Sequence, residues 1–563
     1  MIQQPSPIRS LFSGRTGPAF AQRTWPGRPD TWLIVVAVLV NLSWRLVRYG
    51  LNFPIWGDEA MLAVNICDRD WIGLTGTLDY NQTAPLGFLW AESCMARMFG
   101  TSLYALRLLP LVCGILSTLL FVRLACAWLP RRSAALAIAV FCASYYPVRH
   151  ATEIKPYAVD LFVCLCLTLL GLQLHRNRNR HRGWLAWVLL SVVAVWCSYP
   201  AVFVCGGVLL ALLPGVIVER DSGRRCWWAL SAGMLCISFA TMSHMLFATQ
   251  ADHIAELASS EMWRGAFPPL DQPWTIPWWL LRIHAGRMLA YPLGGDDWGS
   301  LPTLILVTLG IAAAYRSRRR QDLPLFLAPA VCALFAACLH TYPYGGSART
   351  SLFLAPAICL LAGSGLHSVC RRGSCGILVR KRVRALCLAL MFLTCGGVVR
   401  DVVQPYKTMS DAQLRRAFID LLRRSEPDEP WIVVNRLANH EPQQTVMPGG
   451  LTVPDFDFYT RTLGQSRLLP SRQLDDLAPE HPVVWLVTHV STRHPVDPSH
   501  QARSFAALSS AYVRTEHVRW QLDAFESLQA WKFSLPRHDF HGDAVRRRMA
   551  TSASAGASAV QGN

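Results

Sequence analysis

Long apolar runs recur along the first four hundred residues and alternate with short polar segments. Each run has about twenty residues, the length that an α-helix needs to cross the hydrocarbon core of a bilayer. The pattern predicts an α-helical polytopic membrane protein with about 11 transmembrane helices. The expected helices cover 31–51, 103–129, 133–148, 156–174, 184–199, 200–218, 226–247, 301–315, 323–341, 349–369 and 384–400.

Basic residues gather in the polar segments that follow every second apolar run. These segments are 130–132, 175–183, 219–225, 316–322 and 370–384. Short cytoplasmic loops retain Lys and Arg, so these connections are expected in the cytoplasm. The N-terminus then lies in the cytoplasm and the C-terminal region lies outside it. We therefore expect a multi-pass protein of the cell (inner) membrane.

The positions of the basic residues also explain the net charge of +18. A basic chain can bind nucleic acid, but such proteins concentrate Lys and Arg on one face or in one motif. Here the basic residues are spread over the membrane connections, so we expect no nucleic-acid partner. Only 16% of residues are charged, against about a quarter in soluble domains. This excludes a soluble enzyme for the apolar part of the chain.

The two ends of the chain differ from its middle. Residues 1–30 are polar and are predicted to form a cytoplasmic tail. The first apolar run is long for a signal peptide and lacks a small-x-small cleavage site, so we expect it to remain as an anchor. The predicted transmembrane catalytic domain spans 31–400, with large outer loops at 52–102 and 248–300. Cys67 and Cys94 both fall in the first of these loops, where a disulfide is one option.

The sequence becomes soluble in character after about residue 401. Trp431–Val434 and Val483–Val487 have the composition of buried strands, and 411–424 has the apolar spacing of a helix. Residues 401–550 are therefore predicted to form a small extracytoplasmic α/β domain. The last stretch, 551–563, is rich in Ala, Ser and Gly and is predicted to be disordered.

Asp58 and Glu59 are adjacent carboxylates directly after the first apolar run. Charged side chains are costly near lipid, so the pair is not expected to anchor in lipid, and we expect a water-exposed acid at the outer membrane surface. A positioned carboxylate there can act as a general base on a hydroxyl group. The pair also provides the candidate ligands for a divalent metal ion, because hard cations prefer oxygen. The sequence indicates no other cofactor.

Three further segments carry candidate substrate-binding residues. Tyr80, Asn81 and Gln82 precede an amphipathic segment at about 86–98, and they form either a substrate-facing wall or the capped start of an interfacial helix. The second outer loop interleaves Glu153 with cations, and Asp160 follows inside the next span with Lys155 or Arg149 as its expected counter-ion. These substrate-binding candidates of the second loop are Arg149, Glu153, Lys155 and Tyr157.

The fifth outer loop contains Gly345-Gly346 and then Arg349. A Gly-Gly turn allows backbone amides to approach an anion, and an arginine can clamp a phosphate with two parallel hydrogen bonds. The alternative is a plain turn with an arginine whose charged end reaches the membrane surface. Both interpretations remain open on the sequence.

Three of these segments resemble motifs of the GT-C glycosyltransferases, most closely glycosyltransferase family 39, the protein mannosyltransferase and aminoarabinose transferase relatives of bacteria. They are Trp56–Ala60, Tyr80–Gly87 and Glu153–Ala158. The resemblance covers about residues 30–400. It implies a GT-C-like fold and inverting transfer of a sugar from a polyprenyl-phosphate donor to an acceptor hydroxyl on the extracytoplasmic face. The acceptor is a glycan, a lipid or a protein.

The resemblance also implies roles for single residues. It makes Asp58 the base for the acceptor hydroxyl, Glu59 its support and Lys155 the holder of the lipid phosphate. The leaving group is a phosphate, already an anion, so it needs a cation rather than a general acid. Some relatives carry a basic residue where this chain has Gln82-Thr83. That departure leaves the phosphate contact and the class of sugar open.

Two other functions are compatible with a polytopic chain. A transporter or flippase for lipid-linked saccharides would carry charged residues deep in several helices and a repeated helix pattern. The sequence shows neither feature. A non-catalytic membrane assembly protein would make no demand on Asp58 or Glu59. Substitution of these carboxylates therefore distinguishes the enzyme from the assembly protein.

Overall fold

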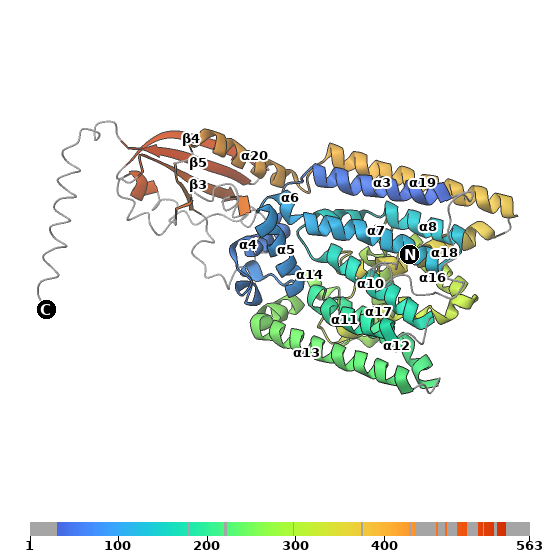
Figure 1. Ribbon diagram of the computed structural model, residues 1–563. Helices are drawn as coiled ribbons and strands as arrows, with labels where there is room; N and C mark the ends of the chain where they lie inside the picture. The colour runs from blue at the N-terminus through green and yellow to red at the C-terminus, as the bar shows by residue number, and fades with distance from the viewer. Residues whose placement is uncertain are drawn as a thin grey trace, which may run out of the picture. The chain divides into compact units, whose positions relative to one another are not determined.

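The computed structural model describes thirteen stretches of the chain: 31–176, 181–218, 222–259, 261–296, 298–372, 375–426, 429–434, 458–459, 468–469, 481–491, 505–509, 512–522 and 526–535. The chain divides into two compact units (Figure 1). The first unit comprises Met1–Asn52, Arg69–Thr77 and Thr83–Gln404. The second comprises Phe53–Asp68, Leu78–Gln82 and Pro405–Asn563. The predicted tails at 1–30 and 551–563 lie outside the described residues.

A helix is present for each of the predicted membrane runs. These helices are α3 (Thr31–Gly50), α7 (Leu108–Trp128), α8 (Arg131–Ala143), α10 (Tyr157–Arg176), α11 (His181–Cys197), α12 (Ala201–Val218), α13 (Ser222–Ser259), α16 (Leu301–Tyr315), α17 (Pro324–Cys338), α18 (Ala355–Arg371) and α19 (Gly376–Val403). Within the described residues, eight helical segments are long and apolar enough to cross a membrane, and α11 and α16 are apolar but shorter. The predicted multi-pass helical membrane protein is confirmed.

Helix α8 differs from the others because it is short and buried on all sides. Its residues from Ser133 to Ala143 are all buried, as expected for a helix that is apolar or small all round. It packs against α3, α18 and α19. A Cβ atom on Gly363 of α18 would collide with the backbone of Ala137, so this helix pair approaches closely through small residues.

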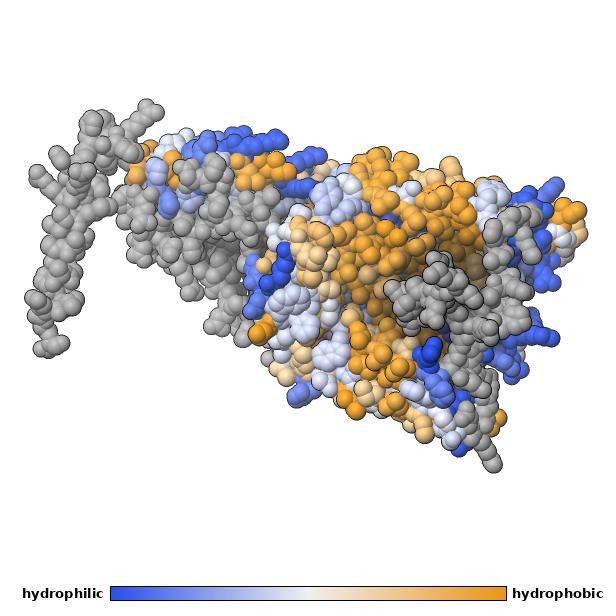
Figure 2. Space-filling view, viewed as in Figure 1, coloured by the Kyte–Doolittle hydropathy of each residue, from blue (hydrophilic) through white to orange (hydrophobic). Residues whose placement is uncertain are grey.

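The outward faces of the helices in the first unit are apolar. Large exposed side chains include Val36, Leu39 and Leu46 on α3, and Phe392 and Val399 on α19. Figure 2 shows the resulting hydrophobic surface in orange over the helices. A surface of this size and composition is costly in water and suits contact with lipid.

The predicted cytoplasmic connections meet at one end of the helices. Arg176, at the end of α10, forms a 2.6 Å ion pair with Asp322 before α17. Arg131, at the start of α8, donates to the hydroxyl of Thr31 at 2.6 Å. Basic connections and the start of α3 therefore lie together, as the charge pattern predicts. Which side of the membrane they occupy stays a prediction from the charge rule.

The polar segments between these longer helices contain short helices. These are α4 (Gly57–Asp68), η1 (Gly73–Thr75), η2 (Asp79–Asn81), α5 (Leu86–Phe99), α6 (Leu103–Leu106), α9 (Tyr145–Arg149), η3 (His150–Thr152), α14 (Glu261–Arg264), η4 (Pro273–Thr275), α15 (Ile276–Ala285) and η5 (Arg287–Leu289). The amphipathic segment predicted at 86–98 is confirmed as α5. Several boundaries differ. The helix predicted to end at 148 ends at Ala143, and α13 continues to Ser259, into the loop predicted from 248. The helix predicted from 384 begins at Gly376.

The C-terminal part of the second unit is the predicted small α/β domain. Helix α20 (Met409–Arg424) begins with a capping box formed by Thr408 and Asp411. The strands are β1 (Trp431–Val434), β2 (Leu468–Leu469), β3 (Val483–Ser491), β4 (Val513–Gln521) and β5 (Glu526–Ser534). They form one sheet in the order β2-β1-β3-β5-β4. Strand β1 is parallel to β2 and β3, and β5 is antiparallel to β3 and β4.

Candidate functional site

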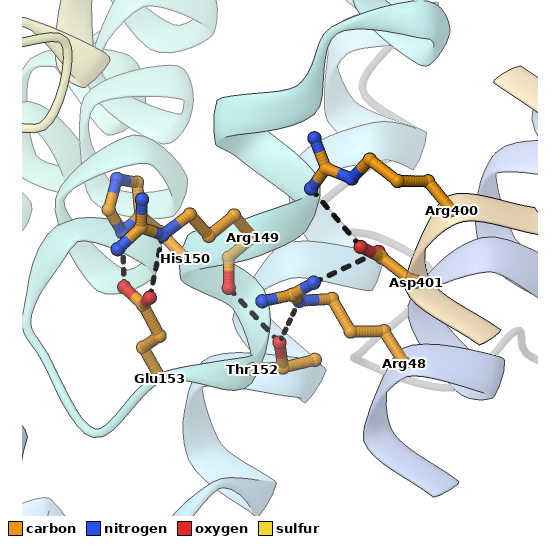
Figure 3. Close-up of polar contacts among 7 residues, drawn as sticks. All are labelled: Arg48, Arg149, His150, Thr152, Glu153, Arg400 and Asp401. Carbon is orange, nitrogen blue, oxygen red and sulfur yellow. Dashed lines mark hydrogen bonds and ion pairs between the residues drawn. The ribbon is translucent and has the colours of Figure 1, made fainter. Parts of the chain in front are cut away.

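Glu153 lies at the centre of a buried polar cluster in the first unit (Figure 3). Arg149 Nε donates to Glu153 Oε1 at 2.7 Å, and His150 Nδ1 lies 2.7 Å from Oε2. His150 lies three positions before Glu153, and Arg149 lies four positions before it. One helical turn through α9 and η3 therefore places the three side chains side by side. Only 4% of Glu153 is exposed. Both oxygens of the carboxylate are thus engaged by neighbours from its own segment.

The two partners keep Glu153 ionised. Burial by itself would raise the pKa of this carboxyl, but Arg149 and His150 hold the pKa well below its usual range. Burial lowers the pKa of His150, and the charge of Arg349 acts in the same direction. His150 is therefore neutral at pH 7. A carboxylate only accepts hydrogen bonds, so Nδ1 of His150 carries the proton and donates it.

Arg349 of the fifth outer loop lies near this cluster, since its charge acts on His150. Its guanidinium carbon is 5.6 Å from the centroid of the Trp263 ring. The predicted Gly-Gly turn is present, with φ of +70° at Gly345 and +68° at Gly346. A Cβ atom at either glycine would collide with Ile283 or Ala266, respectively. These glycines therefore have a packing role, while a role in anion binding stays a prediction.

Lys155 and Tyr157 complete the segment. Lys155 is buried, and its backbone N–H donates to the carbonyl of Glu153 at 2.8 Å. The Tyr157 ring lies edge-on to His150, with ring centroids 4.9 Å apart. The structure thus brings together four predicted substrate-binding residues of the second loop and Arg349.

Asp160 does not have the counter-ion that the sequence suggested. Arg149 pairs with Glu153 instead, so its predicted pairing with Asp160 is wrong. Asp160 is 7% exposed in the first turn of α10, and within the described part of the chain its Oδ1 has no hydrogen-bond partner. Tyr199 and Tyr342 lie close enough to interact with it electrostatically. Among the described residues, the carboxyl thus has polar neighbours and no cation paired with it.

Sequence reasoning missed a second set of polar residues beside this cluster, namely Arg48, Thr152 and Asp401 (Figure 3). Arg48 donates to the Thr152 hydroxyl at 2.9 Å and forms a 2.9 Å ion pair with Asp401. The signal was present, because charged residues inside apolar spans almost always have a partner or a function. The pairing of Arg48 with Asp401 joins residues more than three hundred positions apart, which local sequence patterns do not predict.

Asp58 and Glu59 lie in the second unit, in the first turn of α4. Carboxylates are favoured there, because backbone N–H groups and the helix dipole give the N-terminus positive character. Asp58 is half-buried, whereas Glu59 is fully buried at 0% exposure. In the same unit, burial and, to a smaller extent, the charge of Glu59 raise the pKa of Asp411. The acidic pair is therefore near the start of α20.

The predicted wall at 80–82 is held against α4. The Asn65 amide donates to the Asp79 carbonyl at 3.2 Å and accepts from the Asp79 N–H at 2.8 Å. Tyr80 has φ of +59°, which is uncommon for a residue other than glycine and costs about 1 kcal/mol or more. Gln82 Nε2 donates to the Tyr80 carbonyl at 3.3 Å. The side chain of Asn81 lies outside the described residues.

The metal prediction receives no support from the donor sets. Within the described stretches, no group of three or more His, Cys, Asp or Glu residues is placed to hold a metal ion. Asp58 and Glu59 alone provide too few ligands for Mg²⁺ or Ca²⁺. A metal ion at this pair stays a prediction. Cys94 carries a free thiol, so the disulfide considered between Cys67 and Cys94 is wrong.

Comparisons with known proteins show which solved structures share this fold. No family model matches the chain, and no curated protein matches it. Two solved structures of ArnT from Cupriavidus metallidurans match with a TM-score of 0.52. The structure bound to undecaprenyl phosphate is 15% identical and covers 89% of this chain and 98% of its own. The apo structure is 14% identical, with coverage of 89% and 97%.

The oligosaccharyltransferase AglB from Archaeoglobus fulgidus also matches, in complex with an inhibitory peptide and a dolichol-phosphate. It is 11% identical, with a TM-score of 0.44 and coverage of 90% of this chain and 74% of its own. The resemblance to GT-C glycosyltransferases in the sequence motifs therefore agrees with the structural likeness to ArnT. This chain has the fold of a GT-C glycosyltransferase.

Proposed function

We propose that the protein is a membrane glycosyltransferase that moves a sugar from a polyprenyl-phosphate donor to an acceptor hydroxyl on the extracytoplasmic face. The observation that carries this proposal is the carboxylate pair Asp58-Glu59 at the start of α4, in a chain with the fold of ArnT. At 15% identity the likeness shows the fold alone. The choice of donor is motivated by the ArnT structure, which contains bound undecaprenyl phosphate.

The charges of the second and fifth loops suit an anionic donor. Glu153 is an ionised carboxylate, and neutral His150 adds no charge. By sequence, the segments 145–156 and 342–349 contain three cations, Arg149, Lys155 and Arg349, and one carboxylate, which is an excess of two positive charges. Such an excess stabilises the phosphate that develops as the leaving group. We assign donor binding to Lys155 and Arg349, with Arg149 held by Glu153.

The reaction follows from these groups. Asp58 accepts the proton of the acceptor hydroxyl, and its oxygen attacks the anomeric carbon of the donor sugar. The bond between that carbon and the phosphate oxygen breaks, and the electron pair leaves with the polyprenyl phosphate. A single displacement inverts the anomeric configuration. One carboxylate and a cationic site suffice, unlike the two carboxylates that glycosidases place across the bond.

The transporter alternative is not favoured by the buried charges. Arg45 and Arg48 lie in the last turns of α3, and Asp160 lies in the first turn of α10. All three thus lie near one end of the helices rather than at the middle of the membrane, where transporters place their binding sites.

Reconstitution in nanodiscs tests the proposal. The purified full chain is incubated with a panel of polyprenyl-phosphate sugars and acceptors, and product and its anomeric configuration are measured by mass spectrometry and NMR. We expect an inverted product with wild type and with the exposed control Asp271→Asn, and a loss of about 10²–10⁴-fold with Asp58→Asn. Bond cleavage that survives in Asp58→Asn, or flipping of lipid without bond cleavage, would refute the assignment.

A further inference from the structure

Three polar residues of α3 point to the segment that carries Glu153. Asn41, Arg45 and Arg48 are separated by four and three positions, which places them on one face of the helix. Asn41 donates to a carbonyl near the end of α8 at 2.8 Å, and Arg45 donates to the Pro147 carbonyl in α9. Arg48 donates to Thr152 Oγ1 in η3 at 2.9 Å. Helix α3 therefore contacts the end of α8 once and the segment that carries Glu153 twice.

Of these three residues, Arg48 also contacts the end of α19, where it pairs with Asp401. Its Nη1 lies 2.9 Å from Asp401 Oδ2. Trp44 Nε1 donates to the same oxygen at 2.8 Å, and Arg400 reaches the other oxygen at 3.2 Å. Asp401 is only 1% exposed. A buried carboxylate with two hydrogen-bond donors and an ion-pair partner has its position closely defined.

Thr152 joins this ion pair to the Glu153 cluster. Its hydroxyl accepts a hydrogen bond from Arg48 and donates one to the Arg149 carbonyl at 3.0 Å. The side chain of Arg149 in turn donates to Glu153. Figure 3 shows the resulting chain of polar contacts, which runs without interruption from Asp401 to Glu153.

Stability alone gives a weak reason for such a network. Removing two charges from water offsets much of the attraction between them, and well-packed apolar residues often serve as well or better. A network that uses a hydroxyl, two guanidinium groups and a carboxylate instead fixes geometry. Asp401 lies in the last turn of α19, and from there the chain continues into the second unit at Pro405.

We propose that Arg48, Thr152 and Asp401 are positioning residues, which fix Arg149 and Glu153 relative to the outer end of α19. They contact no substrate in this scheme and act through Arg149. The inference rests on the proposed function, because it presumes that the Glu153 cluster binds the lipid phosphate. Displacement of Arg149 is then expected to weaken donor binding more than it slows the chemical step.

Thr152 offers a matched pair of variants. Thr152→Val removes the hydroxyl and keeps the shape of the side chain, whereas Thr152→Ser keeps the hydroxyl. Arg48→Lys keeps a charge for Asp401 but loses the fork that reaches Thr152 as well. Each full-length variant is compared with wild type in nanodiscs by three measurements. They are sugar transfer at varied donor concentration, thermal unfolding, and hydrogen exchange of the 145–156 segment.

We expect Thr152→Val and Arg48→Lys to raise KM for the donor about tenfold, with a smaller change in kcat, and Thr152→Ser to resemble wild type. Exchange in 145–156 should be faster in the first two variants only. Equal transfer by Thr152→Val and wild type, or equal losses in Thr152→Val and Thr152→Ser, would overturn the inference. If wild type transfers no sugar, the proposed function fails. The exchange pattern then still decides whether the three residues hold the Glu153 segment.

Discussion

The Glu153 cluster and the Asp58-Glu59 pair place carboxylates in two different environments. Glu153 has both oxygens occupied by Arg149 and His150, and its pKa is held well below the usual range. Asp58 is half-buried at the start of a helix. A carboxylate that is saturated and strongly acidic is a poor base, whereas a partly exposed one can be reached by an acceptor hydroxyl. We therefore propose charge placement for the first region and proton transfer for the second.

The largest effect on stability is expected from Glu153. Glu153→Ala leaves Arg149 and His150 without their shared acceptor in a buried site, and such losses cost about 3–5 kcal/mol of unfolding free energy. Asp58→Ala should change the unfolding free energy less, by about 1 kcal/mol or under, since Asp58 is partly exposed at the start of a helix. Thermal unfolding of both variants in nanodiscs checks the contrast. Equal losses would remove the distinction between the two regions.

Arg349 sharpens the assignment of the first region to anion binding. Arg349→Ala removes a cation near the Glu153 cluster, and we expect the dissociation constant for undecaprenyl phosphate to rise by about tenfold to a hundredfold. Arg264→Ala, at an exposed arginine in α14, is the control. Calorimetric titration of the lipid phosphate measures both. Unchanged affinity in Arg349→Ala would favour the plain-turn interpretation of the fifth loop.

Acid sensitivity tests the protonation states. The folded pKa of His150 lies below its ordinary value, so the unfolded state binds protons first as the pH falls. Stability from this group is complete above about pH 6.5 and is lost as the pH falls through the folded pKa. Glu153 adds a further loss below about pH 4.3. His150→Asn keeps a donor for Glu153 and should remove the first step in unfolding curves measured from pH 8 to 5.

The smallest effect is expected at Asp160. This buried carboxyl has no cation partner among the residues that the structure describes. Asp160→Asn keeps the shape and removes a group that is costly to ionise, so the unfolding temperature should stay the same or rise. A clear fall would show that Asp160 carries a charge that the protein uses.

The pattern of apolar residues predicted the helices well, because a membrane helix needs a continuous run of about twenty apolar residues. The run at 156–174 became α10, and the strand at 431–434 became β1. The end of α8 was misplaced because the predicted run continued to 148, whereas the helix ends before Tyr145 and the chain begins the separate turn of α9 there. Ser144 between the two helices has an extended conformation, with ψ of 124°, and periodicity does not report such a local break.

The candidate site was predictable only in part. Adjacent charges such as Asp58-Glu59, and Arg149 with Glu153 four positions later, are visible in sequence because one helical turn brings them together. The Arg48–Asp401 pair joins residues from α3 and α19, and the pairing of Asp160 was predicted wrongly. Partners that are distant in sequence depend on how the helices pack, and the spacing of residues along the chain does not predict that packing.

Single-turnover transfer by Asp58→Asn, measured beside Glu153→Gln with donor binding determined for each, tests the central claim most directly. We predict that Asp58→Asn binds undecaprenyl phosphate like wild type but transfers sugar about 10²–10⁴-fold more slowly. Glu153→Gln should instead alter the affinity for the lipid phosphate, because it removes the ion pair that holds Arg149. Wild-type transfer by Asp58→Asn would contradict the account.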